Sequence, residues 1–527
     1  MSQKKIVYFC IMFVRKKPNR SGSTSVVVIE KHKGKVCYLK TIGISSDANE
    51  IDELYAQGKR WIMEQIGQRD MFLEYSRQGE ERNVIEGLLS KVEHVLLNGT
   101  QLILNPVYQN IGFDKINDDV LKHLVVSRIC QPQSKVSTVD YLKSYFDEDI
   151  DLNKVYRYLD KLSDSQKDTI QELSVSHTRK VLGGKIGVVF YDVTTLYFET
   201  DKDDCLRKKG WSKDGKHSQP QVVLGLLVSN GGYPLAYSIH EGNKYEGHTM
   251  LPVIKDFVAK FKLKDFVVVA DSGMMNSENI AELDRNGYKY IIGAKIKSEN
   301  NTIKKWILSQ NKQNGCFYEY QKTEQQKLIL GYSEQRGKKD AYNRDKGIKR
   351  LEKEYGNGLI TKDKINKRGY NKFLQLTDNV GIAIDYAKIE EDAKWDGMKG
   401  YITNTAFSAK DVYQQYSELW QVERAFRVTK GVLELRPMFH FTKKRIEAHV
   451  CICFVAYKVY KELERILKNN GISMSVDKVL SIAKTITTIR VKLQENNETI
   501  SKTMLLTDKH KSIKKLFEPD FWNNNLL

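Results

Sequence analysis

Two aspartates close short apolar runs of the sequence and are the first residues with the means to do chemistry. Asp192 follows IGVVFY at 186–191, and Asp271 follows FVVVA at 266–270. Ligands of open α/β sheets bind at the carboxyl ends of the strands, so adjacent parallel strands would bring these two carboxylates together. Close carboxylates repel each other and need a compensating cation. With no His or Cys nearby, these oxygen ligands favour Mg²⁺ or Mn²⁺ over Zn²⁺.

A third carboxylate, Glu423, lies on a stretch with helical apolar spacing that predicts one long helix over 409–433. Glu423 is seven residues from both Tyr416 and Lys430, which would stack the three side chains on one face. The buried stripe beside that face is predicted to be Val422, Phe426, Thr429 and Leu433. Each aspartate alone could instead cap a turn or a helix. Three carboxylates in this arrangement favour a shared metal site.

The segments around the two aspartates predict the sheet that positions them. Unbroken Val/Ile runs separated by helical stretches are typical of a mixed α/β sheet that is covered on both faces. The predicted order is strand 186–191, strand 221–229, strand 233–240, helix 247–260, strand 266–270, helix 277–286 and strand 288–295.

The flanking segments differ in composition from this sheet. We expect an α+β region over 1–110, a helical and possibly DNA-binding region over 111–182, and a basic C-terminal tail over 468–527. The segment 298–405 separates the second aspartate from Glu423 and is predicted to be an inserted basic domain. Between Glu334 and Lys372 it has 13 basic and 6 acidic residues. A further apolar helix is predicted over 446–467.

The overall composition predicts a folded protein with a polyanionic partner. The chain of 527 residues is 41% hydrophobic, and its 85 basic against 66 acidic residues give a formal charge of +19. Such an excess favours nucleic acid, although it could also solvate a surface. No stretch reaches the about 20 apolar residues of a membrane span, so no membrane partner is expected. Seven cysteines without a C-x-x-C pair favour a reducing, cytoplasmic location.

The helix around Glu423 resembles the Tyr-x2-Arg-x3-Glu-x6-Lys signature of bacterial insertion-sequence DDE transposases. Tyr416, Glu423 and Lys430 match in type and spacing, whereas Leu419 occupies the arginine position. Arg424 and Arg427 are candidates to replace that arginine. Other similar blocks are YDVTTLYFE around Asp192, QPQVVLGLLVSNGGYPLAYSIHEGN, VVVADSGMMNSENIAEL around Asp271, and VERAFRVTKGVLELRPMFH.

The resemblance is closest to large transposases with an insertion before the catalytic glutamate. It implies a ribonuclease-H-like mixed sheet core over 183–297 and 406–467, the inserted domain 298–405, and a helical N-terminal region. It also implies a nucleoid-associated DNA transposase that cleaves transposon ends and transfers the strand into target DNA, working on double-stranded DNA as a homodimer.

The chemistry implied is phosphoryl transfer with two Mg²⁺ or Mn²⁺ ions. Asp192 is expected to bridge both ions, and Asp271 and Glu423 to hold one each. Tyr416, Lys430 and Lys295 are expected to contact DNA, as are Arg424 and Arg427. Relatives stack a flipped base on an aromatic residue of the insert, for which Trp306 and Trp395 are the candidates.

Two alternatives stay open at this point. A hydrolytic DNA nuclease without strand transfer would use the same carboxylates and ions. A non-catalytic DNA-binding derivative of a transposase would need neither, and the presence of Asp192, Asp271 and Glu423 argues against it.

Overall fold

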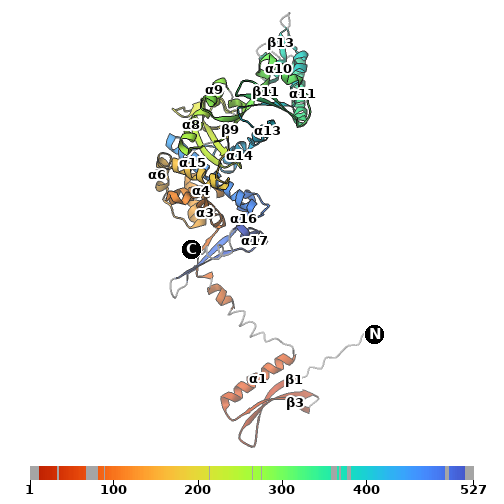
Figure 1. The fold of residues 1–527 in the computed structure, drawn as a ribbon. Coiled ribbons are helices and arrows are strands. Elements are labelled where there is room, and N and C mark those ends of the chain that lie inside the picture. Colours follow the sequence, from red (N-terminus) through yellow and green to blue (C-terminus); the bar gives the residue numbers. More distant parts are fainter. Residues whose placement is uncertain are drawn as a thin grey trace, which may run out of the picture. The chain divides into compact units, whose positions relative to one another are not determined.

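The structure is a computed structural model, and it divides the chain into two units (Figure 1). The first unit comprises residues 1–95 and 489–501, and the second comprises 96–488 and 502–527. The residues that the structure describes are 11–32, 35–66, 81–87, 89–212, 214–263, 265–274, 276–357, 365–366, 369–376, 381–492 and 498–516.

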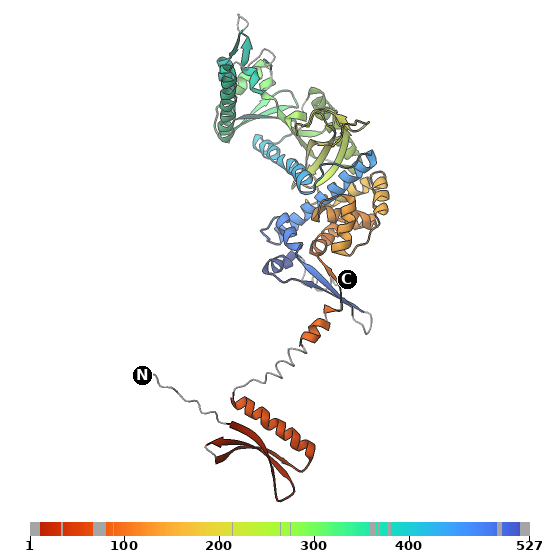
Figure 2. The ribbon, with the colours of Figure 1, turned by 180° about the vertical axis from the view of Figure 1, so that it is seen from behind.

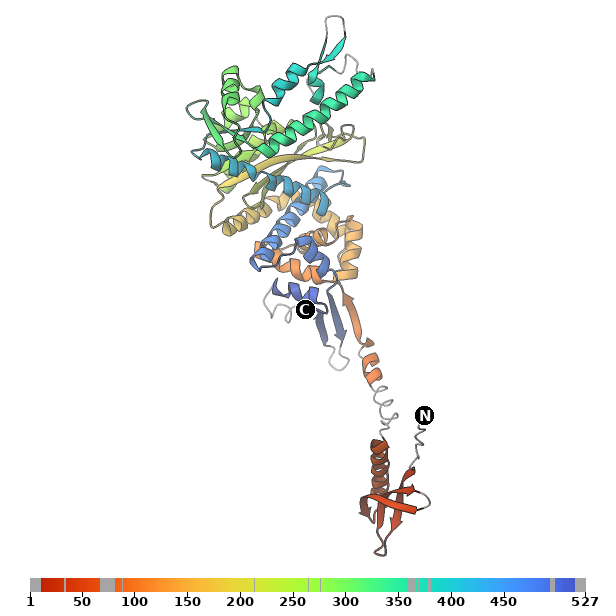
Figure 3. The same cartoon turned by 90° about the vertical axis from the view of Figure 1, so that its right-hand side faces the viewer.

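The first unit contains a three-stranded antiparallel sheet with a helix along one face (Figure 3). The sheet runs β1 (Ile11–Pro18), β2 (Thr24–His32), β3 (Lys35–Ser45), and the helix is α1 (Ala48–Ile66). Val14, Val26 and Val28 are buried beneath this helix. The described residues of the first unit therefore combine strands with a helix, the composition expected of an α+β region.

The second unit is built on a nine-stranded mixed sheet of order β11-β12-β15-β10-β9-β5-β7-β6, with β8 paired to β7. Only the β5–β9 and β9–β10 pairs are parallel among the described strands of this sheet. Its strands are β5 (Val188–Tyr197), β6 (Lys208–Lys209), β7 (Pro220–Ser229), β8 (Pro234–Glu241), β9 (Val267–Ala270), β10 (Lys289–Ala294), β11 (Phe317–Gln321), β12 (Lys327–Tyr332) and β15 (Met398–Thr403).

Helices cover both faces of this sheet, which explains why its strands are apolar on both sides. One face packs on α8 (Met250–Phe261), α9 (Ser277–Arg285) and α10 (Asn301–Ser309). The other face packs on α13 (Ala409–Ser417), α14 (Trp420–Arg427) and α15 (Lys443–Asn469). Figure 1 shows α8 and α9 on one side of β9, with α13 and α14 on the other. The predicted α/β order from 186 to 295 is confirmed.

A helical bundle packs around α15, whose central turns are buried on all sides. Figure 2 shows the earlier helices gathered around it. They are α3 (Gly99–Ile111), α4 (Asp119–Cys130), α5 (Lys135–Tyr141), α6 (Leu152–Ser165) and α7 (Lys167–Val181). The sequence predicts a helical region over 111–182, and α4 to α7 lie within it. None of the helices in the described part of the chain combines the length and apolarity needed to cross a bilayer.

The segment between β10 and α13 both extends the sheet and adds a separate cover. Strands β11, β12 and β15 continue the sheet from β10. The remaining elements of this segment are α11 (Glu334–Gly356), the β13–β14 hairpin (Leu374–Leu376 and Ile382–Ile384) and α12 (Tyr386–Ala393). The predicted insertion is therefore partly continuous with the core sheet.

The C-terminal region is more regular than its weak pattern suggested. It forms α16 (Val476–Ala483), β16 (Thr487–Lys492), β17 (Thr499–Met504) and α17 (Asp508–Ile513). Strands β17 and β16 form a three-stranded sheet with β4 (Val92–Leu96). Apolar residues such as Val479 and Leu480 are buried here. The apolar stretch around them is too short to predict a helix from the sequence.

Candidate active site

Asp192 and Asp271 stand at matching positions of the adjacent parallel strands β5 and β9. Tyr191 of β5 pairs with Ala270, the last residue of β9, and each aspartate is the next residue in the chain. Neighbouring strands are about 5 Å apart, so the two backbones are close at this point. Side chains alternate along a strand. Because Phe190 and Val269 face the core beneath α13–α15, both aspartates are directed to that same face.

The sequence-based placement of Asp192 at a strand end is wrong. Strand β5 continues to Tyr197, because its second half pairs with β7 from Asp192↔Leu226 to Tyr197↔Gln221. The parallel partner β9 ends at Ala270, so Asp271 does follow its strand. Asp192 therefore lies where the parallel pairing stops but the antiparallel pairing continues.

Glu423 reaches this face on α14, which packs against β5 and β7. The predicted single helix over 409–433 is corrected: α13 ends at Ser417, a turn follows, and α14 begins at Trp420. The turn is tightened by backbone bonds of the i→i−3 type, such as Leu419 N–H to the Tyr416 carbonyl at 3.0 Å. After Arg427 a π-helical turn, η8 (Val428–Val432), again changes the angle between successive side chains around the helix axis. The regular stacking of 416, 423 and 430 therefore does not hold.

Leu419, which stands where the transposase signature has an arginine, has a packing role. Leu419 is only 6% exposed and belongs to the core beneath the helices. An arginine at this buried position in the turn would need a partner for its charge. The predicted stripe of Val422, Phe426, Thr429 and Leu433 is buried as expected.

Asp271 and Glu423 line one pocket of about 360 Å³, which we call the carboxylate pocket. Tyr416 forms part of its wall. The Tyr416 hydroxyl donates to Asp271 Oδ1 at 3.1 Å, and the Ser272 N–H donates to the same oxygen at 2.7 Å. Burial, followed by the charge of Asp271, raises the pKa of Tyr416 well above its usual range. The tyrosine therefore stays protonated and holds one oxygen of Asp271.

A glycine makes the contact between Tyr416 and Asp271 possible. A Cβ atom at Gly293 of β10 would lie 2.6 Å from the Tyr416 hydroxyl and 3.0 Å from the Ser272 backbone nitrogen. The first distance is shorter than side-chain packing allows and the second is tight, so any larger residue would displace the tyrosine or the Ser272 turn. Sequence reasoning missed Gly293, since a glycine within a strand indicates a close approach but not its partner.

The donor chemistry of the site fits hard divalent cations, although the ligands are not gathered into one set. All three side chains are carboxylates, which Mg²⁺ and Mn²⁺ prefer. Among the described residues, no group of three or more His, Cys, Asp or Glu side chains is close enough to hold one ion. Without a cation, the like charges of the three carboxylates repel each other. Hydrogen bonds from the protein orient two of the three: Asp271, as described above, and Asp192, whose Oδ1 accepts from the Val193 N–H at 2.8 Å. Asp192 lies beside Asp271 on the sheet, and Glu423 shares its pocket.

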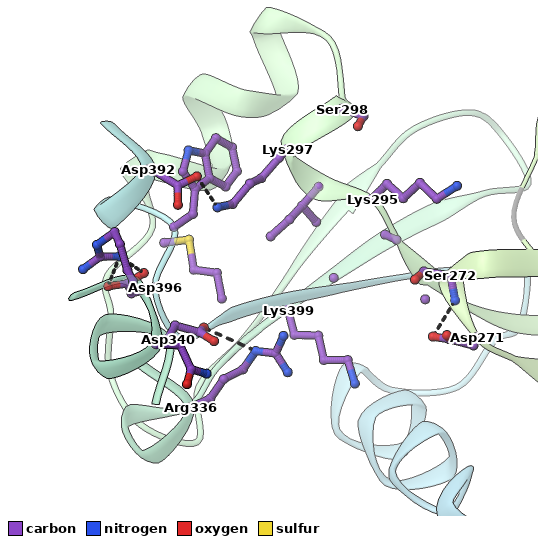
Figure 4. A pocket seen from close by; sticks show the side chains of 18 of the residues that line it. Asp271, Ser272, Lys295, Lys297, Ser298, Arg336, Asp340, Asp392, Asp396 and Lys399 are labelled. Carbon is purple, nitrogen blue, oxygen red and sulfur yellow. Dashed lines mark hydrogen bonds and ion pairs between the residues drawn. The ribbon is translucent and has the colours of Figure 1, made fainter. Parts of the chain in front are cut away.

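A second and larger cavity, of about 630 Å³, adjoins the carboxylate pocket through Asp271, Arg336, Lys399 and Tyr416 (Figure 4). We call it the basic cleft. Basic side chains from the core strands, α11 and the segment after it line this cleft. They are Lys295, Lys297, Arg336, Arg344, Lys372 and Lys399.

The predicted DNA contacts occupy different surroundings. Lys295 is exposed and lines the basic cleft. Lys430 lies 3.4 Å from Asp214, and Arg424 pairs with Glu464, so neither lines the cavities described above. Arg427 is exposed on α14.

The aromatic residues that are candidates for DNA contact also differ in their surroundings. Tyr416 is 4% exposed, which leaves it little surface for DNA. Trp395 lines the basic cleft, whereas the ring of Trp306 packs on Tyr320 at 5.0 Å between centroids. Trp395 is thus the better placed of the two tryptophans for a ligand.

Tyr416→Phe is expected to lower kcat about tenfold with little change in KM, because it removes the hydrogen bond that orients Asp271 and leaves the ring in place. The measurement is the rate of Mg²⁺-dependent DNA cleavage. Tyr413→Phe on the same helix is the matched control, since that side chain lines the same pocket but is 38% exposed and packs its ring on Phe317. Equal rates for the two variants would show that the bond does not position Asp271.

Comparisons with known proteins identify the family to which the chain belongs. The "Transposase DDE domain" family matches residues 183–458, which are 276 of the 527 residues. No curated protein matches the chain significantly. Among solved structures, the chain is similar to piggyBac transposase in a synaptic complex with hairpin DNA, with 9% identity, 70% of each chain covered and a TM-score of 0.38. Since the family match covers more than half of the sequence, the chain belongs to the transposase DDE domain family.

Proposed function

We propose that this DNA transposase cleaves transposon ends and joins them to target DNA with Asp192, Asp271 and Glu423 as the metal-binding carboxylates. The observation that carries the proposal is the convergence of the three on one sheet face. Asp192 and Asp271 are neighbours across the β5–β9 pair, and Glu423 shares a pocket with Asp271. The sheet order, with helices on both faces, supports a ribonuclease-H-like core for residues 183–297 and 406–467.

The three carboxylates would hold two Mg²⁺ or Mn²⁺ ions. When bound, such ions lower the pKa of an attacking water and stabilise the leaving oxygen. The chain's own part is to fix the carboxylates in place. Tyr416 and the Ser272 amide do this for Asp271, and the Val193 amide does it for Asp192.

The reaction needs no covalent bond to the protein. Water bonds to phosphorus at the transposon end, the P–O3′ bond breaks, and the 3′ oxygen leaves as a hydroxyl. That hydroxyl then loses its proton and bonds to a phosphorus of target DNA, and the target's own 3′ oxygen leaves and takes up a proton. Lys295, an exposed side chain of the basic cleft, would bind the phosphate backbone.

The arrangement in the cell follows from this activity. We infer a homodimer, because a synaptic complex holds two ends. We also infer a cytoplasmic location on the bacterial nucleoid, in keeping with the +19 charge of the chain. The Tyr416–Glu423–Lys430 match supports membership of the Tyr-x2-Arg-x3-Glu-x6-Lys subgroup.

The test is a two-step assay with the purified full chain and DNA that carries the terminal repeats flanking its gene. We expect cleavage that requires Mg²⁺ or Mn²⁺ and is absent in chelator. We also expect a pre-cut end with a 3′ hydroxyl to be joined to a plasmid. Cleavage without joining would favour the hydrolytic nuclease, and DNA binding without either reaction would favour the non-catalytic derivative.

A further inference from the structure

Lys399 is a cation at the centre of the site to which no role has yet been given. It lies near the start of β15, the strand that returns from the segment after α11 to the core sheet. It lines both the carboxylate pocket and the basic cleft. In Figure 4 its side chain extends across the space between Arg336 and Asp271. Sequence reasoning missed it, because a single lysine among the 85 basic residues carries no signal.

The surroundings of Lys399 differ from those of the other cations of the cleft. Lys297 and Lys372 both pair with Asp392, at 2.7 Å and 2.9 Å. Arg344 binds both oxygens of Asp396, and Arg336 lies 3.6 Å from Asp340. Within the described part of the chain, no carboxylate lies within ion-pair distance of Lys399. Its ammonium instead rests over the Tyr416 ring, 4.5 Å from the centroid.

Lys399 shares the carboxylate pocket with the two candidate metal ligands Asp271 and Glu423. Burial and then the charge of Arg336 lower the pKa of Lys399, and the charges of Asp271 and Glu423 oppose this shift. Tyr416 links the two sides, since its ring lies under the ammonium and its hydroxyl donates to Asp271. A positive charge here reduces the repulsion between the two carboxylates. It also competes electrostatically with any divalent ion that binds them.

We propose that Lys399 is the internal counter-ion of Asp271 and Glu423 in the protein without DNA, and that it contacts a backbone phosphate of the bound strand once divalent ions neutralise those carboxylates. The inference rests on the proposed function, which supplies both the ions and the phosphate. The consequence is a coupling between metal binding and DNA binding. Divalent ions neutralise the carboxylates that attract Lys399, and a DNA phosphate then becomes its partner. Binding of metal and of DNA should therefore reinforce each other through this side chain.

The physical basis of the coupling is the half-buried position of the ammonium. A cation there, next to Arg336, is stabilised only while a negative charge is close. Divalent ions on the carboxylates remove that stabilisation and add repulsion. A phosphate oxygen is the anion that restores it, and the wall shared by the two cavities places Lys399 where a strand in the basic cleft would pass the carboxylates.

Lys399→Gln tests the inference with two readouts of opposite sign. Without DNA, the variant is expected to bind Mn²⁺ about three- to tenfold more tightly, as measured by electron paramagnetic resonance of free Mn²⁺, because a competing charge has gone. In Ca²⁺, its affinity for the labelled terminal duplex is expected to fall about fivefold or more by fluorescence anisotropy. In chelator, that affinity should hardly change. Lys399→Arg should keep the metal dependence of DNA binding.

Lys297→Gln is the matched control, because it removes one charge from the same cleft at a lysine paired with Asp392. Its Mn²⁺ affinity should stay within about twofold of the unaltered chain. A Lys399→Gln chain that binds Mn²⁺ no more tightly, or loses DNA affinity equally in Ca²⁺ and in chelator, would overturn the inference. Failure of the proposed function looks different: Asp271→Asn would then leave Mn²⁺ binding unchanged, whatever Lys399 does.

Discussion

Asp271→Asn is expected to lower the rate of Mg²⁺-dependent cleavage at least about a thousandfold, or about 4 kcal/mol of transition-state stabilisation. The substitution is isosteric. Its amide oxygen can still accept from the Tyr416 hydroxyl and the Ser272 N–H, so the local fold is retained. The substitution removes one negatively charged metal ligand. The loss of rate therefore measures how much that charge contributes to catalysis. Asp192→Asn and Glu423→Gln are expected to behave alike.

The control for Glu423→Gln is Glu418→Gln, since this glutamate lies in the turn just before α14 and bonds to Gln421. We expect its cleavage rate to remain within about threefold of the unaltered chain. Each variant should bind the terminal duplex in Ca²⁺ and unfold at an unchanged temperature. Full activity in any one of the three triad variants would remove that residue from the site.

The sheet and the residues of the site could be predicted because both leave strong local signals. Apolar runs such as 266–270, separated by stretches with helical spacing, are typical of strands covered on both faces. An acid immediately after such a run then falls at the sheet edge where ligands bind. Asp271 illustrates this directly.

The break between α13 and α14 could not be predicted, because it depends on tertiary packing. Apolar residues continue at helical spacing through Ser417–Leu419, so the pattern favours one helix. Burial of Leu419 in the core instead stabilises the tight turn. For the same reason Lys430, which the spacing placed beside Glu423, lies near Asp214, far away in sequence.

Contacts made by single residues were also beyond sequence reasoning. Gly293 and Lys399 become informative only when β10 and β15 are paired and α13 is packed over them. The pairing brings the glycine under Tyr416 and the lysine over it. Neither residue stands in a spacing pattern that points to the other.

The largest stability effect is expected at Glu462, a carboxylate buried in α15. Its side chain is 1% exposed and accepts two hydrogen bonds from Arg465, at 3.0 Å and 2.6 Å, while His177 lies 3.5 Å away. Burial alone would raise the pKa of Glu462, but His177 and Arg465 lower it to about 2. Lys458, one turn earlier, is fully buried and donates to the Ser174 carbonyl at 3.0 Å. These contacts tie α15 to α7.

Glu462→Gln is expected to lower the free energy of unfolding by about 3 kcal/mol at neutral pH. Removing one partner of a buried ion pair leaves the other uncompensated, which costs about 3–5 kcal/mol. The depressed pKa gives a similar figure, since a drop from 4.5 to about 2 corresponds to about 3 kcal/mol. The measurement is hydrogen exchange of the α15 amides, together with the urea midpoint. Glu464→Gln, which alters a more exposed carboxylate paired with Arg424, is expected to cost about 1 kcal/mol or less.

The pH dependence separates the charge of Glu462 from its shape. A carboxyl whose pKa is lower in the folded chain stabilises the fold above its unfolded pKa, and this stability is lost as the pH falls through the folded value. The difference between Glu462→Gln and the unaltered chain should therefore be complete above about pH 5 and shrink toward pH 2. Lys458 acts in the same direction at higher pH: burial lowers its pKa to about 7, so stability again rises with pH from there to its unfolded value near 10.5. An equal loss of stability at pH 3 and pH 7 would contradict the electrostatic account, because packing alone does not titrate.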